Sequence, residues 1–479
     1  MPNLTDFYIN GEWMTPQGAS PMDVINPATE ESVGQVSLGT ADHIDQAVTA
    51  ARAAFPAWST TSPDQRREML SKLADVYEAR NTEMAQAIST EMGAPITMAT
   101  RAQAGSGISH LRTFMDKIGD VLWTETPDPD APQHQILREP AGVAALITPW
   151  NWPMNQVVLK VGAALAAGCT MVLKPSEIAP LSSMLFAEFC DEAGVPAGVF
   201  NLVNGDGATA GSALTAHPEV NVISFTGSTR AGKLISHAAA DNIVRVSLEL
   251  GGKSPNIVFA DADVEEAVKR GVAHVMNNSG QSCIAPTRML VERSVYDEAV
   301  TIAAAAADET VVADPAQEGG HIGPLVSAAQ FDKVQGLIED GISEGARLVA
   351  GGPGRPEGME VGYFARPTVF ADATNDMKVS QEEIFGPVLV MMPFDTEEEA
   401  IEIANDTPYG LAAYVQTGDA DRAQRVSRQL DAGLVAINGS GRAAGSPFGG
   451  YKQSGIGREG GTFGIEEFLE IKNVAGLLQ

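Results

Sequence analysis

One cysteine and one glutamate, each close to glycine, are the residues of this sequence best suited to covalent chemistry. Cys283 ends the run Ser279-Gly280-Gln281-Ser282-Cys283, and Glu249 lies in Leu248-Glu249-Leu250-Gly251-Gly252-Lys253. A thiolate attacks electrophilic carbon, and a carboxylate can take the thiol proton or activate a water molecule. The two motifs therefore suggest a nucleophile with its base. We expect the apolar neighbours of Glu249 to raise its pKa, as a base that works near neutral pH requires.

The thiol follows a predicted helix. Asp263 and Glu266 have the spacing of a helix start, apolar residues recur on one face as far as Val275, and the run Asn278-Ser279-Gly280 ends the helix with a left-handed glycine. Cys283 is then expected on an exposed loop just beyond a helix C-terminus. The dipole there would raise the pKa of a thiol rather than lower it, so activation has to come from elsewhere.

Alternating strands and helices are predicted to position these residues. After an extended start, helical periodicity dominates the first hundred positions. From residue 142 onward, short apolar runs alternate with helical segments that end at glycine, which predicts a parallel sheet with helices on both faces and ligands at its carboxyl edge. The predicted strands are Gly142–Thr148, Thr170–Lys174, Val199–Val203 and Val220–Phe225, and the predicted helices are Val157–Ala167 and Ser182–Glu192. A second α/β pattern begins near Gly251.

Polar residues near three strand ends each allow two interpretations. The Asn151 amide can donate to a developing oxyanion, or it can form a turn before Pro153. Lys174 and Glu177 can bind a nucleotide ribose, where an acid favours NAD over NADP, or they can belong to an exposed charged turn. Ser228 can face a phosphate or simply cap a helix.

Two further glycine-containing turns are ambiguous. Glu383 and Phe385 can hold a nicotinamide ribose, or they can lie in a solvated acidic turn. The stretch from Gly455 to Gly460 matches the pattern G-x-G-x-x-G, but no βαβ unit follows it, so we reject it as a cofactor fingerprint.

Composition excludes several classes of protein. The 479 residues hold 31 Lys and Arg against 61 Asp and Glu, a net charge of −30 at pH 7, and so acidic a surface repels nucleic acid. No apolar run has the length of a membrane span, and the N-terminus lacks a signal-peptide pattern. Cys169, Cys190 and Cys283 are spaced too widely for a disulfide framework or a zinc site. We therefore expect a cytoplasmic protein of two or three domains, with no metal and no membrane partner.

Seven motifs occur in a fixed order along the chain. They are Trp150-Asn151-Trp152-Pro153, Lys174-Pro175-Ser176-Glu177, Phe225-Thr226-Gly227-Ser228, Leu248-Glu249-Leu250-Gly251-Gly252-Lys253, Gly280-Gln281-Ser282-Cys283, Glu383-Ile384-Phe385-Gly386-Pro387 and Pro447-Phe448-Gly449-Gly450. Together they resemble the NAD(P)-dependent aldehyde dehydrogenase superfamily over nearly the whole chain, and the glutamate and cysteine motifs are the most specific. The resemblance implies an α/β fold with two Rossmann-like parallel domains and a small β element for oligomerisation.

The resemblance also implies a role for each motif. Cys283 would attack the aldehyde carbonyl, Asn151 and the Cys283 backbone N–H would hold the oxyanion, and Glu249 would activate the water that hydrolyses the thioester to a carboxylic acid. The cofactor would be NAD, or alternatively NADP. Its predicted binding residues are Thr148, Pro149, Trp150, Lys174, Ser176, Glu177, Gly207, Gly211, Phe225, Thr226, Gly227, Ser228, Leu250, Gly251, Glu383 and Phe385.

The family pattern divides the chain into three parts. Residues 1–120 and 141–250 would form the NAD-binding domain, residues 251–450 the catalytic domain, and residues 121–140 and 460–479 the oligomerisation element. The segment Val121–Gln135 and the tail Phe468–Gln479 would then pair as strands, whereas composition alone also allows a surface loop and a frayed end. A homodimer or homotetramer is the family norm.

The motifs do not specify which aldehyde is the substrate. Trp152 and Ile284, which flank catalytic residues, are expected to line the substrate tunnel, as is Phe448. Many relatives carry an aromatic residue in the stretch 438–446, where this chain has Arg442. This arginine either faces the substrate and favours a carboxylate-bearing or polar aldehyde, or it anchors a surface loop.

Two competing functions, acyl transfer to coenzyme A and a non-catalytic role, predict that particular catalytic residues are missing. Relatives that release the thioester to coenzyme A typically lack the glutamate that is present here as Glu249. A non-catalytic relative would be expected to have lost the thiol, the base or the amide, and Cys283, Glu249 and Asn151 are all present. The sequence therefore predicts a hydrolytic aldehyde dehydrogenase.

Overall fold

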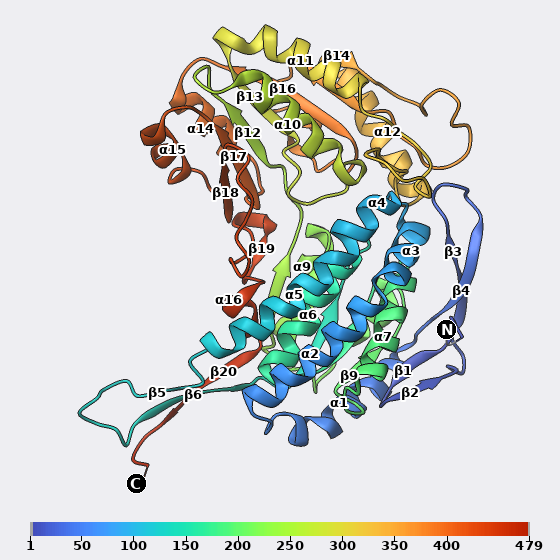
Figure 1. Ribbon diagram of the computed structural model, residues 1–479, viewed down its shortest axis with the longest axis vertical. Helices are drawn as coiled ribbons and strands as arrows, with labels where there is room; N and C mark the ends of the chain where they lie inside the picture. Colours follow the sequence, from blue (N-terminus) through green and yellow to red (C-terminus); the bar gives the residue numbers. More distant parts are fainter. Residues whose placement is uncertain (1–2, 478–479) are drawn as a thin grey trace.

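The computed structural model describes residues 3–477, and its core consists of two mainly parallel sheets in two lobes (Figure 1). The strand order is β19-β11-β10-β7-β8-β9-β1-β2 in the first sheet and β14-β15-β16-β13-β12-β17-β18 in the second. Met1 and Pro2 of the predicted NAD-binding domain lie outside the described residues, as do Leu478 and Gln479 of the predicted oligomerisation element. The predicted pair of parallel α/β sheets is confirmed.

The first sheet is buried on both faces, which explains why its strands are apolar without alternation. Along β7, Val143 and Ala145 pack on one face, whereas Ala144 and Leu146 belong to the core on the other. Its strands are β1 (Phe7–Ile9), β2 (Glu12–Met14), β7 (Val143–Ile147), β8 (Thr170–Lys174), β9 (Phe200–Leu202), β10 (Val222–Thr226), β11 (Arg245–Glu249) and β19 (Gly455–Ile456).

Two groups of helices cover this sheet. One face carries α1 (Ala41–Trp58), α8 (Ser212–Thr215) and α9 (Thr229–Asp241). The other face carries α2 (Pro63–Ala79), α3 (Asn81–Met92), α5 (Gly105–Lys117), α6 (Pro153–Ala167) and α7 (Leu181–Ala193), with the short helices α4 (Ile96–Met98) and α16 (Gly461–Glu466) beside them. Gly168 and Gly194, with φ of 90° and 77°, end α6 and α7 as predicted, because glycine adopts this conformation without a steric penalty.

The second sheet has the same layered construction. Its strands are β12 (Pro255–Val258), β13 (Arg288–Glu292), β14 (Arg347–Ala350), β15 (Thr368–Ala371), β16 (Val388–Phe394), β17 (Ala412–Gln416) and β18 (Leu434–Ile437), and only β14 is antiparallel. One face is covered by α10 (Val264–Met276) and α11 (Tyr296–Asp308), and the other by α12 (Ala328–Ser343), α13 (Lys378–Gln381), α14 (Glu397–Asn405) and α15 (Ala420–Ser427). The Asp263 side chain caps α10 through the Glu266 N–H at 3.1 Å, as its spacing predicts.

A three-stranded arm projects from the first lobe (Figure 1). β6 (Gln135–Pro140) pairs with β5 (Thr124–Glu125) on one side and with β20 (Leu469–Val474) on the other. The C-terminal tail therefore forms a strand in this arm, but it pairs with residues 135–140 rather than with the predicted segment Val121–Gln135, because that segment folds back onto β6 through β5. A separate hairpin, β3 (Ser20–Ile25) and β4 (Ser32–Leu38), reaches the second lobe, where Glu30 accepts a hydrogen bond from Gly362 N at 2.9 Å. Within residues 3–477, no helix is long and apolar enough to cross a membrane.

Candidate active site

Cys283 lies on a loop whose backbone is held in an unusual conformation. Beyond the end of α10, Asn278 and Ser279 have φ of 54° and 56°, and Gly280 follows at 75°. The predicted left-handed position at Gly280 is present, but two non-glycine residues share that conformation. Asn278 Nδ2 donates to the Asn151 carbonyl at 2.9 Å, and Ser279 Oγ donates to a backbone carbonyl at 2.7 Å. These bonds hold the strained backbone, as often occurs at functional sites.

The environment of the Cys283 thiol differs from the predicted exposed loop, because the residue is half-buried. Burial raises the pKa of the thiol, and the carboxylates of Glu383 and Glu249 raise it further. Burial, rather than the helix end, is therefore the leading cause. In the protein alone this thiol stays protonated near neutral pH, so reaction requires a nearby base or a positive charge.

Asn151 is fixed against the cysteine loop. Its side chain is buried, and its Nδ2 donates to the Gln281 carbonyl at 3.0 Å, which leaves the second amide proton for an oxyanion. Gln103, in the π-helical turn Ala99–Ala104, donates to the Asn151 carbonyl at 3.1 Å and to Asn278 Oδ1 at 3.2 Å. Gln103 thus ties the first lobe to the loop, a role that the sequence analysis did not predict.

Glu249 ends β11 as a buried and unpaired carboxylate. It is 2% exposed, and neither of its oxygens has a hydrogen-bond partner among the described residues. Burial raises its pKa, the Glu459 carboxylate adds to the rise, and Lys160 opposes it. The predicted direction of the shift is confirmed. A carboxylate with a raised pKa and free oxygens can accept a proton from water near neutral pH.

Lys160 and Glu459 form a buried ion pair that the sequence analysis missed. The two side chains are 0% and 5% exposed. Together with Glu249 they place one positive charge between two carboxylates, so one negative charge lacks compensation, which favours protonation. A sequence signal for this pair was present, because Lys160 is the one charged residue of helix α6.

Two adjoining cavities follow the carboxyl edge of the first sheet. The larger, of about 860 Å³, is lined among others by Thr148, Pro149, Trp150, Lys174, Ser176, Glu177, Gly207, Gly211, Phe225, Thr226, Gly227 and Ser228. The smaller, of about 210 Å³, is lined among others by Asn151, Leu250, Gly251, Cys283, Glu383 and Phe385. Pro149, Trp150, Thr226, Gly227 and Ser228 line both, so the cavities form one groove. The structure thus brings every predicted cofactor residue into a groove that leads to Cys283.

The polar atoms of the larger cavity suit a dinucleotide. Thr148 Oγ1 and Thr226 Oγ1 are buried without a partner among the described residues. Lys174 is buried, its Nζ donates to a backbone carbonyl at 2.7 Å and lies 3.5 Å from Glu177 Oε2, and burial lowers its pKa. This pair is therefore not the exposed turn of the alternative interpretation. Ser228 does cap α9, and it also lines the groove.

The turn that contains Glu383 and Phe385 packs against the groove rather than extending into solvent. Glu383 Oε1 accepts a hydrogen bond from Gly252 N at 2.9 Å. A Cβ atom on Gly251 would lie 2.5 Å from Glu383 Oε2, so a larger residue at that position would displace the Glu383 carboxylate. The Phe385 ring meets Trp150 edge-on, with centroids 5.4 Å apart.

The four predicted substrate residues take part in three contacts. Trp152 Nε1 donates to Ser282 Oγ at 2.8 Å, and the Ile284 carbonyl accepts a hydrogen bond from Tyr414 at 2.9 Å. The Arg442 guanidinium lies over the Phe448 ring, 4.8 Å from its centroid.

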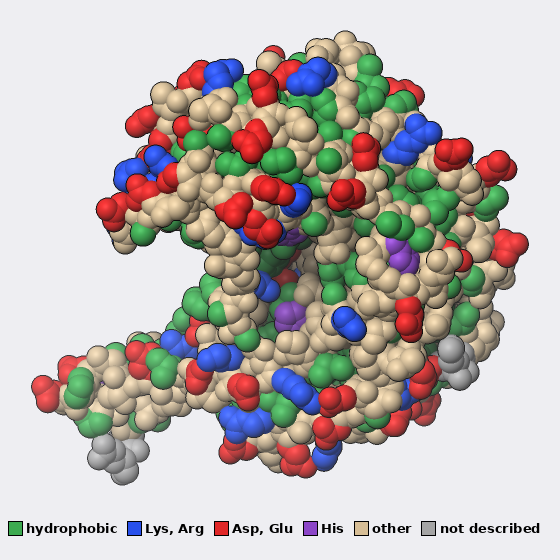
Figure 2. Space-filling view, turned by 45° about the horizontal axis from the view of Figure 1, so that its top comes forward, with side chains coloured by type: hydrophobic (Ala, Val, Ile, Leu, Met, Phe, Trp, Pro, Cys, Tyr) green, Lys and Arg blue, Asp and Glu red, His purple; other side chains and the backbone are tan. Residues whose placement is uncertain are grey.

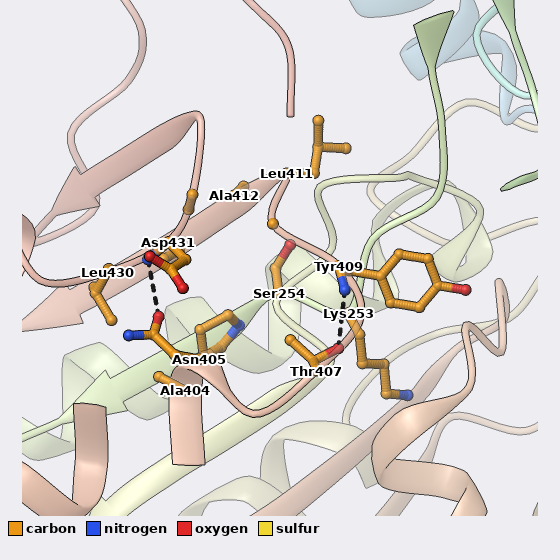
Figure 3. Close-up of a pocket in the computed structure, with 14 residues that line it drawn as sticks. Lys253, Ser254, Ala404, Asn405, Thr407, Tyr409, Leu411, Ala412, Leu430 and Asp431 are labelled. Carbon is orange, nitrogen blue, oxygen red and sulfur yellow. Dashed lines mark hydrogen bonds between the residues drawn. The ribbon is translucent and has the colours of Figure 1, made fainter. Parts of the chain in front are cut away.

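A separate small cavity borders Lys253 (Figure 3). Its volume of about 10 Å³ holds roughly one water molecule, so it does not accommodate a substrate. Lys253 is fully buried, its Nζ has no partner among the described residues, and burial together with Arg288 lowers its pKa to about 7.

A thiol, a buried carboxylate and a side-chain amide at the end of a dinucleotide-sized groove are typical of an oxidoreductase that acts through a covalent cysteine intermediate. The family model of the aldehyde dehydrogenase family matches residues 13–474, and the chain belongs to that family. The predicted family, fold class and enzyme class are confirmed. The chain is thus an enzyme that oxidises aldehydes with a nicotinamide cofactor.

Individual relatives match over their full lengths. The chain is 54% identical to a 3-succinoylsemialdehyde-pyridine dehydrogenase of a Pseudomonas species, over 99% of both proteins. The crystal structure of an aldehyde dehydrogenase from Bartonella henselae superposes with a TM-score of 0.98, at 54% identity and 100% coverage of both chains. A variant of aldehyde dehydrogenase C from Pseudomonas syringae, in complex with NAD+ and octanal, also has a TM-score of 0.98, at 48% identity and with 100% of this chain and 98% of that chain covered.

Proposed function

We propose that this enzyme oxidises an aldehyde to the free carboxylic acid, with NAD+ as the electron acceptor and Cys283 as the nucleophile. The observation that carries the proposal is the continuous groove from Lys174 and Glu177 to the Cys283 thiol, beside the unpaired Glu249 carboxylate. The relative in complex with NAD+ and octanal supports both the cofactor and the type of substrate.

The residues divide the reaction between them. Glu249, directly or through water, takes the thiol proton, and Cys283 attacks the aldehyde carbon to form a thiohemiacetal. Its oxyanion accepts hydrogen bonds from Asn151 Nδ2 and the Cys283 backbone N–H. A bound nicotinamide would accept a hydride from the former aldehyde carbon, and Cys283 would then hold the acyl group as a thioester. Glu249 releases the thiol proton to solvent and then takes a proton from water. The resulting hydroxide attacks the thioester, the carboxylic acid leaves, and the proton on Glu249 returns to the Cys283 thiolate.

Hydrolysis, rather than transfer to coenzyme A, follows from the free oxygens of Glu249. The test is NADH formation from a panel of aldehydes, with and without coenzyme A, by the wild type and by Cys283→Ala. We expect turnover without coenzyme A and none in the variant. Failure of the wild type to oxidise any aldehyde would refute the proposal, and turnover that needs coenzyme A would replace hydrolysis with acyl transfer.

We infer a preference for NAD over NADP from Glu177. Its carboxylate lies near Lys174 in the larger cavity, where an acid hydrogen-bonds ribose hydroxyls and repels a 2′-phosphate. NADP is the alternative, because Lys174 offers a cation. In Glu177→Gln the ratio of kcat/KM for NAD to that for NADP should fall, and an unchanged ratio would contradict the assignment.

We also infer the division into an NAD-binding domain (1–120 and 141–250), a catalytic domain (251–450) and an oligomerisation element (121–140 and 460–479). The separate sheets support it, although β19 joins the first sheet from outside these ranges. Exposed apolar residues on the arm, Leu122 at 58% and Ile471 at 71%, support a homodimer or homotetramer, which light scattering would distinguish from a monomer. Three free cysteines support the cytoplasm.

A further inference from the structure

Arg442 is an exposed residue whose positive charge acts on the reactive thiol and has no hydrogen-bonded acidic partner among the described residues. Glu459, Glu249 and Cys283 are the groups whose charges act on the guanidinium, and none of them hydrogen-bonds to it. Glu459 is already paired with Lys160, and neither oxygen of Glu249 forms a hydrogen bond to the guanidinium. A cation without an acidic partner favours an anionic ligand.

The loop that carries Arg442 lies across helix α5. A Cβ atom on Gly445, three residues later, would lie 3.1 Å from Lys117 Cε and 3.7 Å from Thr113 Cγ2. His110 lies one turn before Thr113 on α5, and the charge of Arg442 acts on it. The loop and α5 therefore bring Arg442 and His110 to the same region. Figure 2 shows the deep cleft between the two lobes, with Lys, Arg and His side chains on its walls.

His110 fixes the orientation of a second donor, Asn155. His110 Nε2 and Asn155 Oδ1 are 2.8 Å apart, and because an amide oxygen only accepts, the imidazole must donate. The amide is thus held with its Nδ2 protons free, and Nδ2 makes no hydrogen bond to any described residue. Burial, the main cause, lowers the pKa of His110, so the imidazole is neutral at pH 7 and adds no charge.

Two aromatic rings complete the surroundings of these donors. Trp152 lies one helical turn before Asn155, where residues three apart share a face, and its Nε1 bond to Ser282 holds it against the cysteine loop. Phe448 carries the Arg442 guanidinium on its ring. One ring thus contacts the cysteine loop and the other the Arg442 guanidinium.

We propose that Arg442 and Asn155 bind a carboxylate at the far end of the substrate, so that the preferred substrates are ω-carboxy aldehydes, the semialdehydes of dicarboxylic acids. His110 acts as a positioning residue, because it holds the Asn155 amide with its N–H groups toward the ligand. The proposal rests on the proposed function, since it concerns the aldehyde that Cys283 attacks.

The test compares kcat/KM for an ω-carboxy aldehyde, the alkanal of equal chain length and a neutral keto-aldehyde. The wild type should prefer the carboxylate, and Arg442→Met should reduce the carboxylate-to-alkanal ratio about 10- to 100-fold, the usual effect of losing one charge-assisted hydrogen bond. Arg442→Lys should recover part of the ratio, because it keeps the charge without the planar fork. Asn155→Leu and His110→Leu should lower the ratio as well.

Two further measurements distinguish an effect of the Arg442 charge from a general structural effect. Arg112→Met removes an exposed arginine of α5 that pairs with Glu78, and it should leave the ratio unchanged. High salt should lower the ratio in the wild type but not in Arg442→Met. A wild type without carboxylate preference, a preference for the keto-aldehyde, or a ratio that Arg442→Met does not change would overturn the inference. If no aldehyde is oxidised at all, the proposed function fails instead.

Discussion

Replacing Lys160 with methionine should destabilise the protein in a strongly pH-dependent manner. Methionine is similar in length to the lysine stem, so the packing inside α6 changes little. What changes is the electrostatics, because Glu459 loses its partner in a site where its side chain is 5% exposed. Breaking a buried pair by removing one partner typically costs about 3–5 kcal/mol.

The destabilisation is limited because Glu459 can become protonated in this variant. The carboxylate can take up a proton, which costs about 1.4 kcal/mol for each pH unit above the ordinary glutamate pKa of about 4.3. This limits the destabilisation to about 4 kcal/mol at pH 7 and about 1 kcal/mol at pH 5. Because Lys160 also lowers the pKa of Glu249, the variant should move the acidic limb of thioester hydrolysis, where Glu249 becomes protonated, to higher pH.

The assay is denaturant unfolding followed by far-UV circular dichroism at both pH values. Lys72→Met is the matched control, because it removes a lysine from an exposed pair with Glu68 and should cost at most about 0.5 kcal/mol at either pH. The double variant Lys160→Met with Glu459→Gln should recover much of the loss. A cost at pH 7 below about 1 kcal/mol, or equal costs at pH 5 and pH 7, would refute the reasoning.

Three further predictions concern single contacts. Asn151→Ala should lower kcat about 100- to 1000-fold through loss of an oxyanion donor, and a loss under tenfold would argue against that role. Tyr414→Phe should lower kcat about 2- to 10-fold, since it removes the hydrogen bond to the Ile284 carbonyl, and an unchanged kcat would show that the bond does not position the loop. Burial raises the pKa of Glu91 from 4.5 to about 7, so the folded state binds its proton more tightly than the unfolded state does. This group therefore contributes about 3 kcal/mol of stability, which is complete below pH 4.5 and is lost as the pH rises through 7. Denaturant midpoints measured from pH 5 to 8 should fall in the wild type. Glu91→Gln should flatten that decline.

The central elements of the fold were predictable because their signals are local. The strand Thr170–Lys174 is an apolar run between a helix-ending glycine and a proline, and the structure has it at those bounds. In contrast, β19 has two residues and pairs with β11, which lies about two hundred positions earlier in the chain. No local sequence pattern therefore predicts this strand. The same is true of the π-helical turn Ala99–Ala104, whose Gln103 reaches the catalytic loop.

The candidate site was predictable in its residues but not in its electrostatics. The motifs identified Cys283, Glu249 and Asn151, whereas the burial that raises the pKa of the thiol depends on how two lobes meet. Lys160, the one charged residue of helix α6, was a usable signal for a buried ion pair. Its partner, Glu459, comes from a segment three hundred residues away that only the fold brings close.

The most direct measurement of the central claim uses Glu249→Gln with an aldehyde and NAD+. If Cys283 forms the thioester and Glu249 activates the hydrolytic water, NADH should appear as a burst that approaches one equivalent per active site. The burst should be slower than in the wild type, because Glu249 also takes the thiol proton. Turnover should then nearly stop, and mass spectrometry should find the acyl group on the Cys283 peptide. Steady turnover at the wild-type rate, or an acyl group on a different residue, would contradict the account.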